Sequence, residues 1–410
     1  MFCIYKFGGA SVKDAIAVEN LKKIISRYSG NQLLIIVSAM GKSTNHLEAI
    51  VDKIVKGDSY EKDLSQFLKY HYDLCNTLFG LIPDEIIKLE YELQKTVNPI
   101  IKNHLEFQDS VVAFGELFST TILAKYLNVQ WVDAREYIKT NDQFSEAEVD
   151  WVLTERFIQK DFPELLSKGI VITQGFIGSD VDKRTTTLGR EGSDYTAAIF
   201  ANCLNAQSLT VWKDVPGLLN ADPKIFPKAE KFDHISYQEV IEMTYYGAKV
   251  IHPKTIHPLA KKGIPLFVRS FIEPMEKGTE ISEDEKVGNK TCFIFKENQI
   301  LVSVRVKDTS FMDERKMSFI LQSLSHVNIK ANLIHNSALT FTFCMDASVM
   351  KRDKIVSYLA EEFQVLYNEN LWLATIKNHT PEAFLMLPEN IEPIIEEKSR
   401  NNYQIVYRLK

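Results

Sequence analysis

A lysine and two adjacent glycines directly follow the first apolar run of the chain, in the stretch KFGGASV at residues 6–12. Adjacent glycines allow the backbone to take positive φ and to bring N–H groups close to a bound anion. A helix that starts at about Ser11 would add the positive end of its dipole, and Lys6 would reach the same anion as a compact charge. Lys6, Gly8 and Gly9 therefore form a candidate phosphate cradle, although such a stretch is also often just a turn.

A second lysine-containing turn, SAMGKST at residues 38–44, contains the Gly-Lys-Ser triplet of a P-loop. A Walker A loop also requires a glycine that opens the loop around the phosphates. This chain has Ile36 at that position, inside the apolar run LLIIV. Because the loop is incomplete, we predict a strand-to-helix turn that lies near a site for another reason.

Arg190 lies in a glycine-rich turn within TLGREGSDYTAA, residues 187–198, and Ser193 or Asp194 opens the helix that follows. An arginine at this place could hold a carboxylate through two parallel hydrogen bonds. The N-terminus of the helix would offer N–H groups to an anion. The same sequence is also compatible with an ordinary helix N-cap beside a solvent-exposed arginine.

Two more stretches have charged residues next to glycine or proline. Glu116 follows Gly115 at a predicted helix start, and WKDVPGLLNADPK, residues 212–224, runs from a strand into Pro-Gly and Asp-Pro turns. A surface carboxylate that stabilises a helix end would explain Glu116 equally well. Each stretch alone is compatible with a purely structural role, and only their combination indicates a functional site.

The composition favours a globular enzyme that acts on small molecules. The chain has 410 residues, 45% hydrophobic and 25% charged, with a formal net charge of -6. This charge argues against a nucleic-acid binder, which normally presents a basic face. Its five cysteines are scattered without a CxxC pair, so neither a disulfide framework nor a zinc site is indicated. With no leader-like N-terminus and only short apolar runs, we expect a cytoplasmic protein without membrane contact.

Strand and helix periodicities alternate over the first two-thirds of the chain. Helical patterns surround the strand-like segments, which lie at residues 33–37, 169–178, 208–215 and 264–270, and residues 46–108 are mostly helical. This alternation predicts an α/β fold, with a mainly parallel sheet between two layers of helices.

The pattern changes at about residue 280, where the polar stretch 278–291 indicates a linker. We expect domains at 1–282 and 298–410. The second begins with the order β-α-β-β-α-β, which is the ferredoxin-like arrangement. A helix near 390–399 and a strand at 403–409 are expected to follow.

Taken together, these stretches resemble the aspartate kinase family, a branch of the amino-acid kinase superfamily. The similar segments, in the family's order, are KFGGASV, VSAMGKSTN, FGELFS, QGFIG, TLGREGSDYTA, WKDVPGLLNADPK, YYGAKVIHPKTIHP and the GT at 278–279. The resemblance implies a carbamate-kinase-like αβα sandwich followed by regulatory ACT modules. It also explains the glycine loop, because this superfamily holds phosphates with such turns rather than with a P-loop.

The implied reaction transfers the γ-phosphoryl group of ATP to the β-carboxylate of L-aspartate, an early step towards lysine, threonine and methionine. The resemblance assigns Lys6 and Asp194 to catalysis. It assigns aspartate binding to Ser38, Thr44, Glu116, Arg190 and Ser193, and nucleotide binding to Lys6, Gly8, Gly9, Lys213, Asp214, Leu219, Lys224 and Lys249. Magnesium should accompany ATP, bound through phosphate oxygens and water rather than by a protein metal site.

Some positions depart from the family pattern. Ala10 stands where threonine is common, Glu191 where glycine is common, Leu219 where an aromatic residue is frequent and Lys224 where arginine is frequent. The 112 residues from Gln299 to Lys410 fit one full ACT module and a truncated second one. Feedback by lysine or threonine at this region and a homodimer are expected from the resemblance alone.

Two other functions remain open at this stage. A sibling kinase with another acceptor, such as glutamate, acetylglutamate or a nucleotide, would share the fold but not the combination of KFGG, FGE and GREGSD. A non-catalytic amino-acid sensor would be expected to lack Lys6 or Arg190, and the chain has both.

Overall fold

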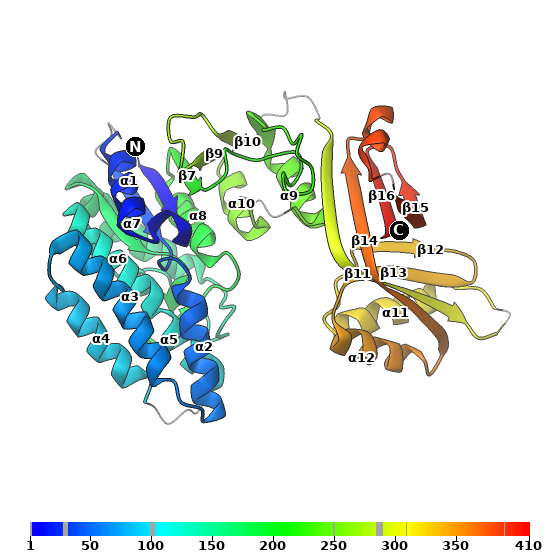
Figure 1. Cartoon of the computed structure of the whole chain (residues 1–410), viewed down its shortest axis with the longest axis horizontal. Helices are drawn as coiled ribbons and strands as arrows, with labels where there is room; N and C mark the ends of the chain where they lie inside the picture. Colours follow the sequence, from blue (N-terminus) through cyan, green and yellow to red (C-terminus); the bar gives the residue numbers. More distant parts are fainter. Residues whose placement is uncertain are drawn as a thin grey trace. The chain divides into compact units, whose positions relative to one another are not determined.

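The computed structural model describes residues 2–27, 32–98, 103–248, 251–283, 290–308, 310–388 and 390–410. The chain forms two compact units (Figure 1). The N-terminal unit consists of Met1–Leu218, Lys231–Ile241 and Val250–Val287, and the C-terminal unit of Leu219–Glu230, Glu242–Lys249 and Gly288–Lys410. Among the described residues, no helix combines the length and the apolar character that a membrane span needs.

The N-terminal unit is built on a sheet of eight strands in the order β3-β4-β2-β1-β7-β9-β10-β8. All neighbouring strands are parallel except β9 and β10. Its strands are β1 (Cys3–Phe7), β2 (Leu33–Val37), β3 (Gln130–Val132), β4 (Val171–Gln174), β7 (Ser208–Lys213), β8 (His234–Ser236), β9 (Leu266–Ser270) and β10 (Thr279–Ser282). A short hairpin of β5 (Ile177–Ser179) and β6 (Thr185–Thr187) stands beside this sheet. The mainly parallel sheet expected from the sequence is confirmed.

Helices cover both faces of this sheet. The helices of residues 1–260 are α1 (Ala15–Ser26), α2 (Ser43–Lys56), α3 (Glu61–Phe79), α4 (Asp84–Thr96), α5 (His104–Val112), α6 (Phe114–Leu127), α7 (Trp151–Ser167), α8 (Gly192–Leu204), α9 (Tyr237–Tyr246) and α10 (Pro253–Ala260), and the boundary between the two units lies within α9. Successive side chains of a strand point to opposite faces. On β2, Leu33, Ile35 and Val37 join the core formed with α1 to α6, whereas α8 packs on the sheet and against α7 and α10. The result is an αβα sandwich.

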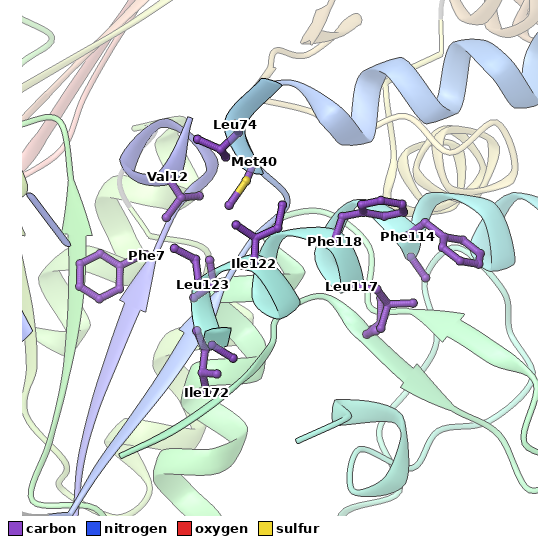
Figure 2. Close-up of a cluster of buried hydrophobic side chains, with 14 of the residues drawn as sticks. Phe7, Val12, Met40, Leu74, Phe114, Leu117, Phe118, Ile122, Leu123 and Ile172 are labelled. Atoms are coloured by element: carbon purple, nitrogen blue, oxygen red, sulfur yellow. The ribbon is translucent and has the colours of Figure 1, made fainter. Parts of the chain in front are cut away.

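Helix α6 is the centre of the larger core. It is buried nearly all round, including Phe114, Phe118 and Ile122. Figure 2 shows these side chains along the helix, with Val12 and Met40 from the loops after β1 and β2 beside them. Apolar contacts at these loops fix the ends of the two strands against the helical layer.

The first helix starts later than the sequence suggested. We expected it at about Ser11, but residues Gly9–Val12 form one 3-10 turn and α1 begins at Ala15. The Asp14 side chain caps α1 by accepting the Ala17 N–H at 2.8 Å. Aspartate is a strong N-cap residue, and the pattern of apolar residues alone could not locate this boundary.

The C-terminal unit carries a six-stranded sheet in the order β12-β13-β11-β14-β16-β15. It consists of β11 (Cys292–Val306), α11 (Glu314–His326), β12 (Leu333–Asn336), β13 (Thr340–Asp346), α12 (Val349–Leu359), β14 (Phe363–Lys377), a 3-10 segment (Pro381–Met386), β15 (Ile391–Lys398) and β16 (Asn402–Leu409). Helices α11 and α12 pack on one face of the sheet (Figure 1). The predicted β-α-β-β-α-β order is confirmed.

The helix expected near 390–399 is wrong, because that segment is strand β15. It pairs with β16 in an antiparallel hairpin, with a register shift between Pro393 and Ile395. Proline cannot donate to a sheet ladder and is tolerated on an edge strand or at a bulge. The glutamates and the lysine of β15 favour a helix locally, but pairing with β16 decides the structure.

The C-terminal unit begins before residue 298 and also includes the two earlier segments Leu219–Glu230 and Glu242–Lys249. The Phe226 ring stacks on Phe293 at 4.9 Å, and the Phe293 N–H donates to the Asn220 carbonyl at 2.7 Å. Glu242 of α9 forms an ion pair with the buried Lys377 at 2.9 Å. The linker predicted at 278–291 includes β10, and residues 284–289 lie outside the described part of the chain.

Candidate active site

A pocket of about 670 Å³ lies in the N-terminal unit. Residues that follow β1, β2 and β7 line it, together with the N-terminus of α8. These strands are parallel neighbours, so their carboxyl ends meet at one edge of the sheet. Open α/β sheets bind ligands at this edge.

The glycine loop after β1 has a different geometry from the one expected. Gly8 has φ -79°, and Gly9 is not among the residues with positive φ. Gly9 is needed for space instead, because a Cβ atom there would lie 2.6 Å from the Ala39 carbonyl oxygen and 2.8 Å from that of Gly41. The Gly41 N–H donates to the Gly9 carbonyl at 3.0 Å. The SAMGKST turn thus holds the glycine loop and is not a P-loop.

Two lysines converge on one buried aspartate. Lys6 Nζ lies 2.5 Å from Asp194 Oδ1, and Lys213 Nζ lies 3.5 Å from Asp194 Oδ2. Burial alone would raise the pKa of Asp194, but the two ammonium groups outweigh it and hold this pKa below its usual range. Asp194 therefore remains ionised and fixes both lysines at the pocket.

Glu116 is buried at the first turn of α6, with 2% of its surface exposed. Its Oε1 accepts the Ala39 N–H at 3.1 Å, while Oε2 has no hydrogen-bond partner among the described residues. Burial raises the pKa of Glu116 to about 8, against the opposing effects of the Ala39 N–H and the Lys6 charge. A buried acid with an unused oxygen is suited to a ligand that donates hydrogen bonds or carries positive charge.

The predicted substrate-binding residues also line the pocket. Arg190 is exposed in the turn before α8, and Ser193 lies in the first turn of that helix. Ser38 and Thr44 come from the turn after β2. No ion pair or hydrogen bond of the Arg190 guanidinium occurs within the described ranges, so this group can meet a ligand.

The predicted nucleotide residues divide into three groups. Gly8, Gly9, Lys213 and Asp214 line the pocket together with Lys6. Leu219 and Lys224 belong to the C-terminal unit. Lys249 lies outside the described residues. In the described part of the chain, no cluster of three or more His, Cys, Asp or Glu side chains could hold a metal ion.

The structure adds pocket residues that the sequence did not single out. Asp109 and Ser145 line the pocket, as does Phe176 after β4. Nothing in the local pattern marks them, because Asp109 lies inside a helix and Ser145 in a loop. Glu191, which departs from the family pattern, takes φ 55° and accepts the His252 N–H at 3.0 Å.

Comparison with known proteins agrees with the fold. Residues 1–270 match the family described as "Amino acid kinase family". The chain is 32% identical over 360 residues to lysine-sensitive aspartokinase 3 of Escherichia coli, covering 84% of this chain and 78% of that one. It is also 31% identical over 300 residues to a bifunctional aspartokinase/homoserine dehydrogenase of Zea mays, covering 69% of this chain and 32% of the relative.

The fold extends this likeness over nearly the whole chain. The crystal structure of E. coli aspartokinase III in complex with aspartate and ADP superposes with a TM-score of 0.84 at 27% identity, covering 99% of this chain and 96% of that one. A kinase of this class transfers phosphoryl groups. The chain belongs to the amino acid kinase family and, within it, to the aspartokinases.

Replacing Gly9 by alanine should destabilise the N-terminal unit and impair the pocket. The new Cβ would overlap the Ala39 and Gly41 carbonyl oxygens, and overpacking of this kind costs about 1–3 kcal/mol. Thermal unfolding of Gly9→Ala and Gly8→Ala measures the effect, because a Cβ at Gly8 meets only Lys6 Nζ at 3.7 Å. Equal melting temperatures for the two variants would contradict this account.

The affinity for an ammonium-bearing substrate should rise with pH. With a pKa of about 8, Glu116 is mostly protonated below pH 7 and gains the charge that attracts an ammonium group as the pH rises. We expect the Kd of aspartate to fall by roughly an order of magnitude per unit between pH 6 and 7. Calorimetric titrations at several pH values measure this dependence.

Glu116→Gln is the matched variant, because the amide oxygen can still accept the Ala39 N–H. It should bind aspartate weakly and without this pH dependence. Glu116 loses its proton near pH 4.5 in the unfolded chain and near pH 8 in the folded protein. The free energy of unfolding of the wild type should therefore fall as the pH rises from 4.5 to 8. The variant should lack this loss, and a parallel decline of both melting temperatures would refute the assignment.

Proposed function

We propose that the pocket of the N-terminal unit transfers the γ-phosphoryl group of ATP to the β-carboxylate of L-aspartate, forming 4-phospho-L-aspartate. One observation carries the proposal. Two lysines held by the buried Asp194 share a pocket with the buried Glu116, whose Oε2 lacks a partner among the described residues. This arrangement offers positive charge to a phosphate and a carboxylate to an ammonium group, which are the two ends of the proposed reaction.

The proposed mechanism needs no general base. A carboxylate acceptor has a pKa of about 4 and is already ionised at pH 7. Phosphoryl transfer then depends on alignment and on stabilising the negative charge of the transferred group. Lys6 would stabilise that charge, and Asp194 would orient Lys6 and Lys213. The loop at Gly8 and Gly9 would supply backbone N–H donors.

Aspartate would be held by its two other ionic groups. Glu116 would meet the ammonium group, and Arg190 would bind the second carboxylate through its two parallel N–H groups. Hydroxyls of Ser38 and Ser193 would add hydrogen bonds, as would Thr44. These groups come from three separate segments of the pocket wall. The ammonium group and the carboxylate on Cα would both be held, which leaves the β-carboxylate as the acceptor.

On the nucleotide side, Lys213 and Asp214 would contact ATP within the pocket. Leu219, Lys224 and Lys249 remain nucleotide contacts proposed from the family resemblance. Since the described residues offer no cluster of metal-binding side chains, Mg²⁺ would be held mainly by phosphate oxygens and water. The ion would neutralise part of the phosphate charge, and the lysines of the pocket would neutralise the remainder.

We also propose that the C-terminal unit binds an amino-acid effector, lysine or threonine. Its strands β12, β13, β11 and β14 have the ferredoxin-like order of ACT modules. The E. coli relative is named as lysine-sensitive. One full module and a truncated second one within 298–410 are the domain arrangement that we favour, with a homodimer as the assembly.

A trapping assay tests the proposed reaction. The protein is incubated with Mg-ATP, hydroxylamine and one carboxylate acceptor from a panel of aspartate, glutamate and acetylglutamate. We expect aspartate hydroxamate from aspartate and no product from the others. Lys6→Met keeps most of the length of the side chain without its charge and should abolish product. Absence of hydroxamate with aspartate would refute the proposal, as would full activity of Lys6→Met.

Arg190→Ala should mainly weaken the use of aspartate. Loss of a charge-assisted hydrogen-bonded pair corresponds to a rise of roughly 10- to 100-fold in the KM for aspartate. The KM for ATP should stay within about twofold. Arg184→Ala is the matched control, because Arg184 forms an ion pair with Asp180 at 2.6 Å and does not line the pocket. An unchanged KM for aspartate in Arg190→Ala would contradict the role.

A further inference from the structure

We propose that Asp109 is a positioning residue for aspartate recognition, which holds the turn that carries Arg190. This inference rests on the proposed function of the pocket. Asp109 lies in α5, far along the chain from Arg190, and is only 1% exposed. It lines the same pocket. None of the family motifs includes it.

The Asp109 carboxylate accepts hydrogen bonds from two separate segments. Its Oδ2 accepts the Ser145 N–H at 2.9 Å and the Thr187 N–H at 2.8 Å. Its Oδ1 accepts the Thr187 hydroxyl at 2.8 Å. All these donors are neutral, and no ion pair of Asp109 occurs among the described residues. Hydrogen bonds from three neutral donors can stabilise a buried carboxylate in the absence of a cation.

Thr187 connects this anchor to the substrate-binding turn. It is the last residue of β6, and Arg190 follows three positions later. Leu188 and Gly189 are the only residues between them, and the Gly192 N–H closes the turn by donating to the Gly189 carbonyl at 3.0 Å. The turn is thus fixed at its start by Asp109 and at its end by α8.

The second segment supports the turn from the side. The Ala147 N–H donates to the Thr187 carbonyl at 2.9 Å. Gly189 has φ 75°, and a Cβ atom there would lie 3.1 Å from Glu146 Cγ and 3.3 Å from the Ser145 carbonyl oxygen. Asp109 also accepts the Ser145 N–H, so it holds both of the segments that meet at this close contact. Small displacements of a binding group are costly when a ligand needs two parallel hydrogen bonds.

A positioning role and a merely structural role predict different results. If Asp109 only stabilises the fold, its removal should lower the melting temperature without a selective effect on either KM. If it positions Arg190, its removal should raise the KM for aspartate and leave the KM for ATP unchanged. The neighbouring Thr186 supplies the matched control, because its hydroxyl bonds to Thr140 at 2.7 Å and neither residue lines the pocket.

The test compares four variants of the full chain with the wild type in the hydroxamate assay. Asp109→Ala should raise the KM for aspartate about tenfold, with an unchanged KM for ATP. Asp109→Asn should restore near-normal values, because its oxygen can accept both backbone N–H groups and its amide can donate to the Thr187 hydroxyl. Thr187→Val should have a smaller effect of the same kind, and Thr186→Val should lower only the melting temperature.

Hydrogen–deuterium exchange gives a readout that does not depend on activity. Amides of residues 187–190 should exchange faster in Asp109→Ala than in the wild type or Thr186→Val. Normal exchange with a normal KM for aspartate in Asp109→Ala would overturn the proposal, as would a failure of Asp109→Asn to rescue. If Asp109→Ala does not fold, the contrast between Thr187→Val and Thr186→Val decides. Failure of the proposed function would appear separately, as a wild type without product.

Discussion

The ionic contact of Lys6, Lys213 and Asp194 is the interaction on which the proposed chemistry depends. It follows from the register of two parallel strands. Lys6 of β1 lies beside Val211 of β7, and Lys213 lies two residues further along β7, on the same face of the sheet. Helix α8 covers that face and places Asp194 in its first turn. The sheet thus brings together two charges that are more than 200 residues apart in the sequence.

A buried ion pair is a poor source of stability, because desolvation offsets much of the attraction. Its value here is conformational. Asp194 offsets the repulsion between the two ammonium groups and fixes their positions at the pocket. The larger aromatic and aliphatic core around α6 supplies the stability, and Figure 2 shows how close its side chains lie to the loops that follow β1 and β2. Because core packing fixes the positions of these loops, the ion pairs only have to fix the side chains of the charged residues.

The sequence predicted the fold class and several charged residues that line the pocket, because these have local signals. Lys6, Arg190 and Asp194 stand at strand ends and helix starts, where glycine marks the turns. Asp109 has no such signal, since only the folded chain brings its carboxylate to Thr187. The positive φ expected for Gly9 was wrong, because this residue is needed for its close approach to the turn after β2, which depends on tertiary contacts. At β15, pairing with β16 overrode the local preference for helix.

Two separate features disfavour an ion pair between Lys6 and Glu116 in the pocket. Lys6 is already paired with Asp194, so it has little need of a second carboxylate. Burial keeps Glu116 largely protonated at pH 7, so it neither competes for Lys6 nor bears the cost of an unpaired buried charge. An entering ammonium group would supply the missing cation and favour loss of the proton. Phosphate groups would in turn meet lysines whose combined charge exceeds that of Asp194 by one. Each end of the pocket therefore becomes fully compensated only when its own ligand is present, which is a physical basis for discriminating two substrates in one cavity.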